Sequence, residues 1–251
     1  MLVDSHCHLE QLPDAGIALA EAASRGVKRV VAVSEDPDSI RAVLALKARF
    51  PDQVVAGLGL HPVWIVQRSP NEVAQALAEL EVVVDRAEVI AEIGLDYKWA
   101  DTAPLQLVQE EALAAQLDLA GRRCLPVSLH SRRCPRQVLE RAVAFRRRTG
   151  QQAHLHWFTH SEKLVRLANE DGLFVSVGPT VLDHPPTQRV ALAVADDLLL
   201  LESDAPVTVS GVPGNPARVR EVAEALARLK GTSVPELAAL TTANLTRFLG
   251  A

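Results

Sequence analysis

Short apolar runs alternate with longer helical patterns from one end of the chain to the other, and this alternation constrains the fold more than any other feature of the sequence. The short runs are rich in Val, Leu and Ile. Continuous apolar runs are typical of parallel strands that are buried on both faces, and strands that alternate with helices indicate a parallel sheet. The predicted strands span residues 2–8, 28–33, 53–59, 88–94, 125–130, 152–157, 173–178 and 197–203.

Helix start and stop signals lie between these strands. Ser69 precedes a proline and lies three residues before Glu72, which is the pattern of a capping box with Pro at the first helical position. Asp14 is a similar cap, and Gly26 ends the helix that follows it. Further helices are predicted over 105–120 with Gly121 as the stop signal, from Pro135 to Gly150, over 217–230 after Asn215-Pro216, and after the cap Ser233.

Eight strands that alternate with helices in 251 residues favour an α/β protein with a (β/α)8 TIM barrel. A doubly wound open sheet is the alternative, but no Gly-x-Gly-x-x-Gly turn follows any predicted strand. The sequence has no internal repeat, low-complexity tract or linker. We therefore predict a single domain over residues 1–251.

Composition and charge narrow the functional classes. Apolar residues make up 48% of the chain, yet none of their runs approaches the roughly 18 residues that a membrane span requires, and the N-terminus lacks the regions of a signal peptide. The three cysteines have no metal-type spacing, so we expect a reducing, cytoplasmic location without disulfides. The net charge of −5 argues against a broad nucleic-acid-coating surface.

Nine arginines nevertheless fall between Arg122 and Arg148. Two interpretations remain open for this segment. It forms a solvated helix face with favourable charge near a helix C-terminus, or it forms a rim that attracts phosphate beside the functional site.

Metal-binding side chains gather at the C-terminal ends of the predicted strands. His6 and His8 lie two residues apart on the first strand, so their imidazoles point the same way. Polar side chains are costly in strands buried on both faces, and in a TIM barrel these strand ends meet where active sites are built. Four histidines and two carboxylates form the ligand set of a carboxylate-bridged metal pair. The six residues are His6, His8, Glu92, His130, His156 and Asp204.

With these residues identified, the chain resembles the TatD family of metal-dependent hydrolases, in the amidohydrolase-like superfamily. Several motifs carry the resemblance, in the family's order and nearly from end to end. They are Asp4-Ser5-His6-Cys7-His8-Leu9, Gly59-Leu60-His61-Pro62, Glu92-Ile93-Gly94-Leu95-Asp96-Tyr97, Gln116-Leu117-Asp118-Leu119-Ala120, Leu125-Pro126-Val127-Ser128-Leu129-His130-Ser131-Arg132, His156-Trp157-Phe158-Thr159, Leu201-Glu202-Ser203-Asp204-Ala205-Pro206 and Asn244-Leu245-Thr246-Arg247-Phe248.

The resemblance implies a (β/α)8 hydrolase that uses two divalent metal ions, Mg²⁺, Mn²⁺ or Zn²⁺, and whose relatives include 3′→5′ exonucleases. It implies that the six residues are metal ligands, that Glu92 bridges the metals, and that Asp204 accepts a proton from the attacking water. Glu92 stands where many superfamily relatives carry a carboxylated lysine, which favours the TatD branch. The expected function is phosphodiester hydrolysis at DNA ends, with Asp204 and Glu92 as catalytic residues.

Residues around the six are assigned further roles. His61 contacts a substrate phosphate or anchors a loop, and Arg132 clamps a phosphate or pairs with a carboxylate. Trp64 and Trp99, on loops after the third and fourth strands, could stack on a base or pack the loops. Three positions depart from the family pattern, namely His154, Trp157 and His160. We expect Asp4, Glu202 and His154 to orient ligands or to fill the core rather than to bind metal.

Two other functions remain open. A metal-dependent esterase or amidohydrolase, such as a D-aminoacyl-tRNA deacylase or a hydrolase of small metabolites, would use the same ligands against a carbonyl group. A metal-binding scaffold without catalysis is the non-enzyme alternative, although every ligand position is intact. The expected partners are DNA ends or small phosphodiester and ester substrates, with no membrane. The oligomeric state is left open, and a monomer is compatible with the sequence.

Overall fold

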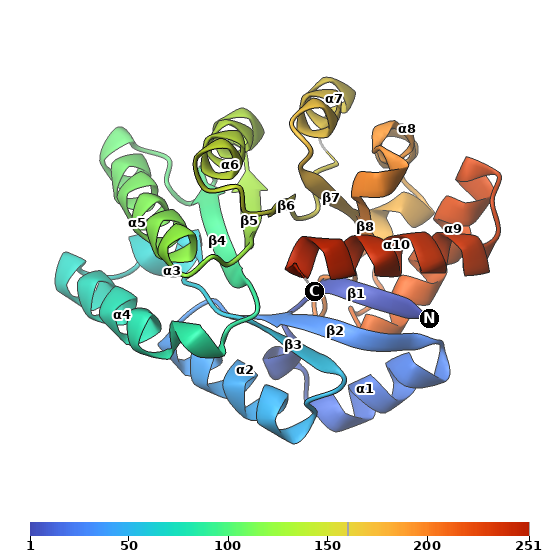
Figure 1. The fold of residues 1–251 in the computed structure, drawn as a ribbon, viewed down its shortest axis with the longest axis horizontal. Coiled ribbons are helices and arrows are strands. Elements are labelled where there is room, and N and C mark those ends of the chain that lie inside the picture. The colour runs from blue at the N-terminus through green and yellow to red at the C-terminus, as the bar shows by residue number, and fades with distance from the viewer. Residues whose placement is uncertain (160, 251) are drawn as a thin grey trace.

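The computed structural model describes residues 1–159 and 161–250, and the strands in this part of the chain all run parallel. Figure 1 shows them surrounded by helices. The strands are β1 (Leu2–Cys7), β2 (Val27–Val33), β3 (Val54–Gly57), β4 (Ile90–Asp96), β5 (Val127–Arg132), β6 (Ala153–Leu155), β7 (Phe174–Val177) and β8 (Leu199–Leu201).

Backbone hydrogen bonds join two groups of strands into one barrel. The first group has the order β1-β2-β3 and the second the order β4-β5-β6-β7-β8. Between β3 and β4, the amide of Leu58 donates to the carbonyl of Val89 at 3.0 Å. Between β8 and β1, the amide of Asp204 donates to the carbonyl of His6 at 3.0 Å. The predicted (β/α)8 TIM barrel is therefore confirmed.

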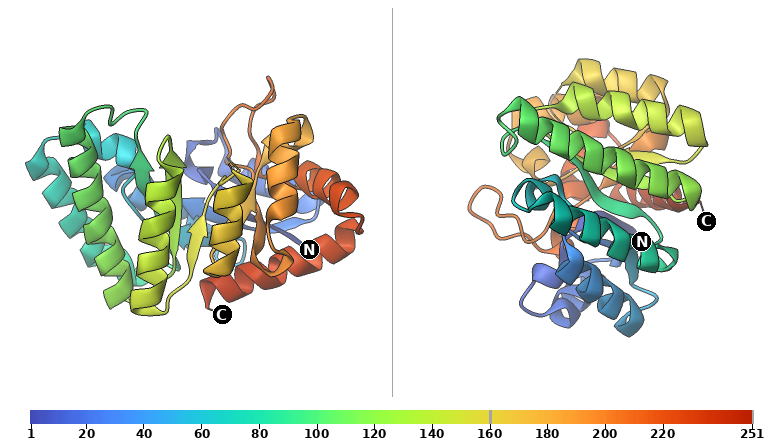
Figure 2. Two further views of the ribbon diagram at one scale, coloured as in Figure 1. Left: turned by 90° about the horizontal axis from the view of Figure 1, so that it is seen from above. Right: turned by 90° about the vertical axis from the view of Figure 1, so that its left-hand side faces the viewer.

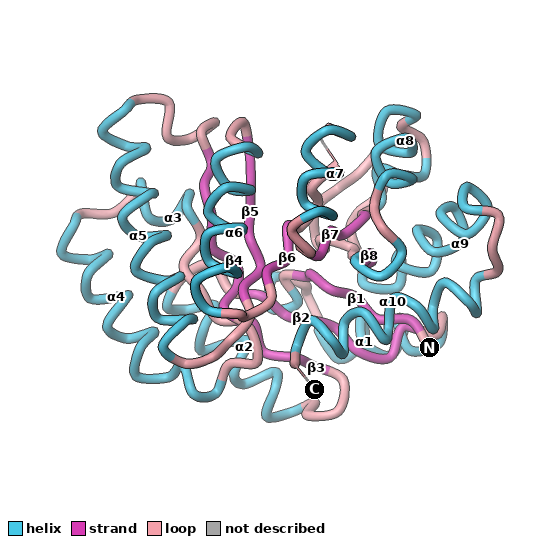
Figure 3. Tube along the Cα trace, turned by 45° about the horizontal axis from the view of Figure 1, so that its top comes forward, coloured by secondary structure: helices cyan, strands magenta, loops and turns pink. Residues whose placement is uncertain are grey.

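The helices alternate with the strands and cover the outside of the barrel (Figure 3). The cap residues Ser69 and Ser233 each form the predicted capping box, and Gly150 ends its helix in the left-handed conformation. The helices are α1 (Ala15–Ser24), α2 (Pro37–Arg49), α3 (Pro62–Val66), α4 (Pro70–Val83), α5 (Ala103–Arg122), α6 (Pro135–Thr149), α7 (Glu162–Glu170), α8 (Pro185–Ala193), α9 (Val219–Lys230) and α10 (Val234–Leu249).

Two sequence-based expectations were wrong in detail. Gly121 lies inside α5, which continues to Arg122, instead of ending the helix. A Cβ at this position would lie 3.0 Å from the side chain of Thr149 in α6, so the glycine permits close packing of the two helices. Trp64 lies in the short helix α3 rather than in a loop.

The strand β5 begins at Val127, two residues after the predicted start at 125. Pro126, which precedes Val127, has no N–H to donate to a neighbouring strand.

The arginine-rich segment is a solvated, ion-paired surface for the most part. Arg123 pairs with Asp85 at 2.7 Å, and Arg147 pairs with Asp171 at 2.6 Å. Such exposed pairs contribute on the order of 0–1 kcal/mol each. The helix-face interpretation of this segment is therefore favoured over a phosphate-attracting rim.

The apolar core has two parts. The larger part lies between the strands and the surrounding helices and includes Cys7. The smaller part includes Val3, Phe174 and Phe248, and Phe248 belongs to α10, which packs against β1 and β8. In Figure 2, α10 lies at the opposite end of the molecule from the loop that follows β8. None of the described helices has the length and apolar character that crossing a lipid bilayer requires.

Candidate metal centre

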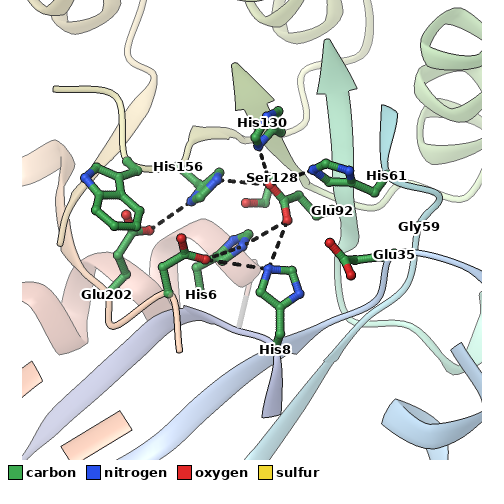
Figure 4. Close-up of polar contacts among 12 residues, drawn as sticks. His6, His8, Glu35, Gly59, His61, Glu92, Ser128, His130, His156 and Glu202 are labelled. Carbon is green, nitrogen blue, oxygen red and sulfur yellow. Dashed lines mark hydrogen bonds and ion pairs between the residues drawn. The ribbon is translucent and has the colours of Figure 1, made fainter. Parts of the chain in front are cut away.

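The six candidate ligands come together at the C-terminal ends of the strands (Figure 4). His6 and Glu92 belong to β1 and β4, and His130 belongs to β5. The other three residues follow their strands within three residues, and these strands end one or two residues earlier than predicted. These three are His8 after β1, His156 after β6 and Asp204 after β8.

Glu92 lies at the middle of the group, and its two carboxylate oxygens face different imidazoles. Its Oε2 atom is 3.3 Å from the Nε2 atoms of both His6 and His8. Its Oε1 atom is 2.8 Å from Nδ1 of His130 and 3.0 Å from Nε2 of His156. Each carboxylate oxygen of Glu92 thus contacts its own pair of imidazoles, and the rings of His6 and His156 also stack with their centroids 3.8 Å apart.

Asp204 belongs with the first pair. Its Oδ1 atom lies 3.5 Å from Nε2 of His8 and 3.7 Å from Nε2 of His6. Its backbone has a φ of +48°, in the left-handed region that costs a non-glycine residue roughly 1–3 kcal/mol. The barrel therefore holds the Asp204 carboxylate in place at an energetic cost, as is common at functional sites.

The unpaired nitrogens of the group fit a metal-binding role. Both ring nitrogens of His6 and the Nδ1 atoms of His8 and His156 are buried without a hydrogen bond to any of the described residues. A buried polar group without a partner costs roughly 1–3 kcal/mol, and a metal ion is a partner that removes this cost. His6, His8 and Glu92 place one ligand atom each within 4.8 Å of one another, as do His61, Glu92 and His130. A third such group contains His6, His156 and Glu202.

The imidazoles control the charge of the carboxylates. Burial alone would raise the pKa of Glu92, but the neighbouring imidazoles, His156 and His6 foremost, hold that pKa well below its usual value. Burial likewise opposes ionisation of Asp204, while a hydrogen bond from His8 and the nearby imidazoles lower the Asp204 pKa. Both carboxylates are therefore anionic near neutral pH and can bind cations.

Further carboxylates contact the imidazoles from outside. Asp96 Oδ2 lies 3.1 Å from Nε2 of His130, and Glu202 Oε2 lies 3.5 Å from Nδ1 of His156. Asp4 instead accepts from the backbone amides of His6 at 3.2 Å and Ser203 at 3.0 Å, which ties β1 to the residues after β8. These contacts are of the orienting kind that we expected for Asp4 and Glu202.

His154 is fully buried, and both of its ring nitrogens have hydrogen-bonding partners. Its Nδ1 atom is 2.9 Å from Ser128 Oγ, and its Nε2 atom is 2.8 Å from Ser176 Oγ. Burial, followed by the charge of His156, lowers the His154 pKa well below its usual value, so the ring is neutral. His154 thus lies in the core, one of the two places expected for it, and is hydrogen-bonded there.

The two candidate substrate-binding residues lie at the same mouth. His61 caps α3 by accepting from the amide of Val63 at 3.2 Å, and its Nε2 atom is 3.7 Å from Glu92 Oε1. The loop-anchoring interpretation is therefore observed, and the ring also faces the centre. Arg132 is exposed and lines the pocket, and its charge contributes to a lowered pKa at Asp96.

A pocket of about 820 Å³ opens onto the centre. Trp157 lines this pocket with its indole N–H donating to Thr180 at 3.1 Å, and Trp99 is half-exposed on its wall. Glu35 and Asp183 also line the pocket, and the sequence alone gave no signal for them because they lie on loops. His160, one of the three departures from the family pattern, lies outside the described residues.

Comparison with protein families matches residues 3–250 to the model described as TatD related DNase. Among curated proteins, the human deoxyribonuclease TATDN3 is 30% identical over 97% of this chain and 92% of its own length. The metal-dependent hydrolase YcfH of Escherichia coli strain K12 is 33% identical over 98% of this chain and 95% of its own length.

Solved structures show the same similarity. The TatD homologue YjjV of Escherichia coli K12 has a TM-score of 0.88 and 28% identity, with 100% of this chain and 98% of that chain covered. A TatD family protein from Entamoeba histolytica has a TM-score of 0.85 over 98% of this chain and 97% of its own, at 15% identity, and so supports the fold alone.

Proposed function

The chain belongs to the TatD family of metal-dependent hydrolases, and on this premise we propose that it is a deoxyribonuclease that hydrolyses phosphodiester bonds from the 3′ end of DNA. The names of the human relative and of the matching family model support the choice of DNA as substrate. The observation that carries the proposal is the position of Glu92, whose two oxygens face separate pairs of imidazoles.

In this proposal the centre holds two divalent metal ions, of Mg²⁺, Mn²⁺ or Zn²⁺. Bound there, such ions lower the pKa of a water molecule and neutralise charge on phosphoryl oxygens. Glu92 would help to hold both ions, since its two oxygens face different imidazoles. The buried nitrogens without hydrogen bonds support this assignment. The proposed ligands are His6, His8 and Asp204 on one side of Glu92, and His130 and His156 on the other.

Asp204 is the proposed proton acceptor. Its carboxylate is anionic and lies at the pocket, so it can orient the attacking water and take up its proton. His61 and Arg132 are the proposed contacts to the substrate phosphate. Arg132 is suited to this role because its guanidinium makes no ion pair within the described residues and presents paired donors to a phosphate.

The test is an activity assay on purified protein that has been stripped of metal and then supplied with Mg²⁺, Mn²⁺ or Zn²⁺. The substrates are single-stranded DNA labelled at the 5′ end and the same strand with a blocked 3′ end. We expect metal-dependent shortening from the free 3′ end and protection of the blocked strand. Equal cleavage of both strands would contradict the exonuclease polarity, and no cleavage with any metal would contradict the nuclease function.

A second candidate is hydrolysis of an ester or amide, such as an aminoacyl ester. The observation in its favour is that Glu35 and Asp183 line the pocket, where carboxylates repel phosphate and attract a substrate ammonium group. Aminoacyl esters tested beside DNA separate the two functions. A preference for an ester with a free amino group over its N-acetylated form would favour the second candidate.

A further inference from the structure

A series of buried polar side chains runs through the barrel interior to the metal centre. Ser128 Oγ lies 2.9 Å from His154 Nδ1, and His154 Nε2 lies 2.8 Å from Ser176 Oγ. Ser176 Oγ in turn donates to Glu202 Oε2 at 2.6 Å. Each of the four residues is at most 1% exposed, so water does not compete for these bonds. We call Ser128, His154, Ser176 and Glu202 the buried chain.

The partners of Ser176 fix the direction of the buried chain. A carboxylate only accepts hydrogen bonds, so the single hydroxyl proton of Ser176 points to Glu202. The Ser176 oxygen also accepts from the backbone amide of Trp157 at 3.0 Å. Since Ser176 has no second proton to give, His154 must donate from Nε2. The Nδ1 atom of the neutral His154 ring is then an acceptor, and Ser128 donates to it.

The buried chain ends beside a candidate metal ligand. Glu202 Oε2 lies 3.5 Å from Nδ1 of His156, and Figure 4 shows the two side chains facing each other. This contact is not a hydrogen bond, but it places the Glu202 carboxyl group behind a ring whose other nitrogen, Nε2, lies 3.0 Å from Glu92 Oε1. A carboxyl group in this position limits the orientations that the imidazole can adopt.

We propose that Ser128, His154 and Ser176 are positioning residues that hold Glu202 beside His156 and so help to orient this ligand. The inference rests on the proposed function in one respect, because it takes His156 to be a metal ligand. The donor order within the buried chain follows from this chain's own contacts and does not depend on the substrate.

Simple filling of the core explains the buried chain less well. Phe248 packs against His154 with the ring centroids 5.6 Å apart, so this end of the barrel is otherwise apolar. Apolar residues at positions 128 and 154 would fill such a space without any need for partners, whereas buried polar groups must be paired. The polar residues here form consecutive bonds that lead to one ligand.

The first test is NMR of the histidine ring nitrogens in the metal-free wild-type protein. We expect His154 to carry its proton on Nε2, because Ser176 can only accept from it. A proton on Nδ1 of His154 would overturn the proposal. The spectra need no bound metal, so they test the inference even if the protein fails to bind Zn²⁺. A failure to bind Zn²⁺ would contradict the proposed function, not the donor order in the buried chain.

The second test is the affinity for Zn²⁺ alone, measured by competition with a chelator. His154→Leu and Ser176→Ala should each weaken binding about 10-fold or more, the range found when groups behind a ligand are removed. His154→Leu should add little in a Glu202→Gln background, because it acts through Glu202.

The matched control is Thr241→Val, which removes a buried hydroxyl that, within the described residues, donates to Leu237 O of its own helix. Thr241→Val should reduce stability without a change in Zn²⁺ affinity. The contrary result is that His154→Leu and Ser176→Ala fold and bind Zn²⁺ with an affinity within about 2-fold of wild type, as the control does, rather than with the expected loss of about 10-fold. That result would show that the buried chain has no positioning role.

Discussion

At the scale of single residues, the centre depends on two buried carboxylates that stay ionised because imidazoles lie next to them. Glu92 and Asp204 are almost completely buried, yet contacts with imidazoles lower the pKa of each carboxyl group. Burial without such contacts would favour the protonated forms, which do not bind cations. The ionisation of each carboxyl group therefore depends on the imidazoles around it, and replacement of one of these histidines should change the pKa of the carboxyl groups that it contacts.

Asp204→Asn should leave the fold intact and reduce turnover by about 10³-fold or more, because the amide can neither accept a proton nor bind a cation strongly. Steady-state hydrolysis of DNA, with circular dichroism to check folding, measures the effect. Asp101→Asn, at an exposed aspartate, is the control and should retain wild-type turnover. An Asp204→Asn enzyme with an unaltered rate would remove Asp204 from its proposed role.

Sequence reasoning reached the candidate ligands because each lies at or near the end of an apolar strand, where a polar side chain is conspicuous. It could not find Glu35 or Asp183, because these residues lie on loops whose paths depend on packing. His154 was expected to orient ligands or to fill the core. Its partners Ser128 and Ser176 come from β5 and β7, and only the folded barrel brings them into contact with it.

At the scale of elements, the positions of strands and helix caps were predictable, while close packing between elements was not. Local signals such as Ser69 with Glu72 act within one turn, so the sequence carries them completely. The role of Gly121 depends on Thr149 in a different helix, and a glycine read alone resembles a stop signal. Likewise, β5 continues to Arg132 through its pairing with β4.

Gly94 tests the close approach of β4 to β5. Its φ is +147°, and a Cβ at this position would overlap the carbonyl oxygen of His130 and lie 2.8 Å from its nitrogen. Gly94→Ala should cost about 3 kcal/mol or more in the free energy of unfolding. Gly231→Ala, also at positive φ (+67°) but with open space around the new Cβ, should cost only about 1–2 kcal/mol. Urea unfolding compares the two variants, and equal costs would contradict the steric account.

The capping box of α10 should make stability depend on pH. Hydrogen bonds from the backbone and side chain of Ser233 lower the pKa of Glu236 from 4.5 to about 2. The charge of Glu236 therefore stabilises the fold above pH 4.5, and this contribution is lost as the pH falls towards 2. The urea midpoint of Glu236→Gln should lie below that of wild type at neutral pH and converge with it in acid.

Glutamine keeps the hydrogen-bonding shape of Glu236, so the Glu236→Gln comparison isolates the charge. Glu111→Gln, at an exposed position of α5, is the control and should show no such convergence. A constant difference between Glu236→Gln and wild type from pH 7 to pH 2 would contradict the account of the cap.

At the scale of the whole molecule, the two ends of the chain complete the barrel together. β1 and the residues after β8 are hydrogen-bonded, and α10 packs against both strands. Thr242 of α10 also donates to the carbonyl of Met1 at 2.9 Å. A barrel that needs both ends of its chain cannot fold in independent halves, so we propose a single domain for residues 1–251.

The metal-free protein should therefore unfold in one transition, with the same midpoint by far-UV circular dichroism and by tryptophan fluorescence. Zn²⁺ at about 100 times its dissociation constant should stabilise the fold by about 2.7 kcal/mol for each independent site, because only the folded state assembles the ligands. Two separate transitions, or a midpoint that Zn²⁺ does not move, would contradict this description.

The central claim is that one buried carboxylate separates two cation sites, and anomalous X-ray diffraction from crystals grown with Zn²⁺ tests it most directly. We predict two peaks that flank Glu92, one beside His6, His8 and Asp204, and the other beside His130 and His156. A map at saturating Zn²⁺ without peaks beside Glu92, or with zinc held by a different set of side chains, would contradict the account.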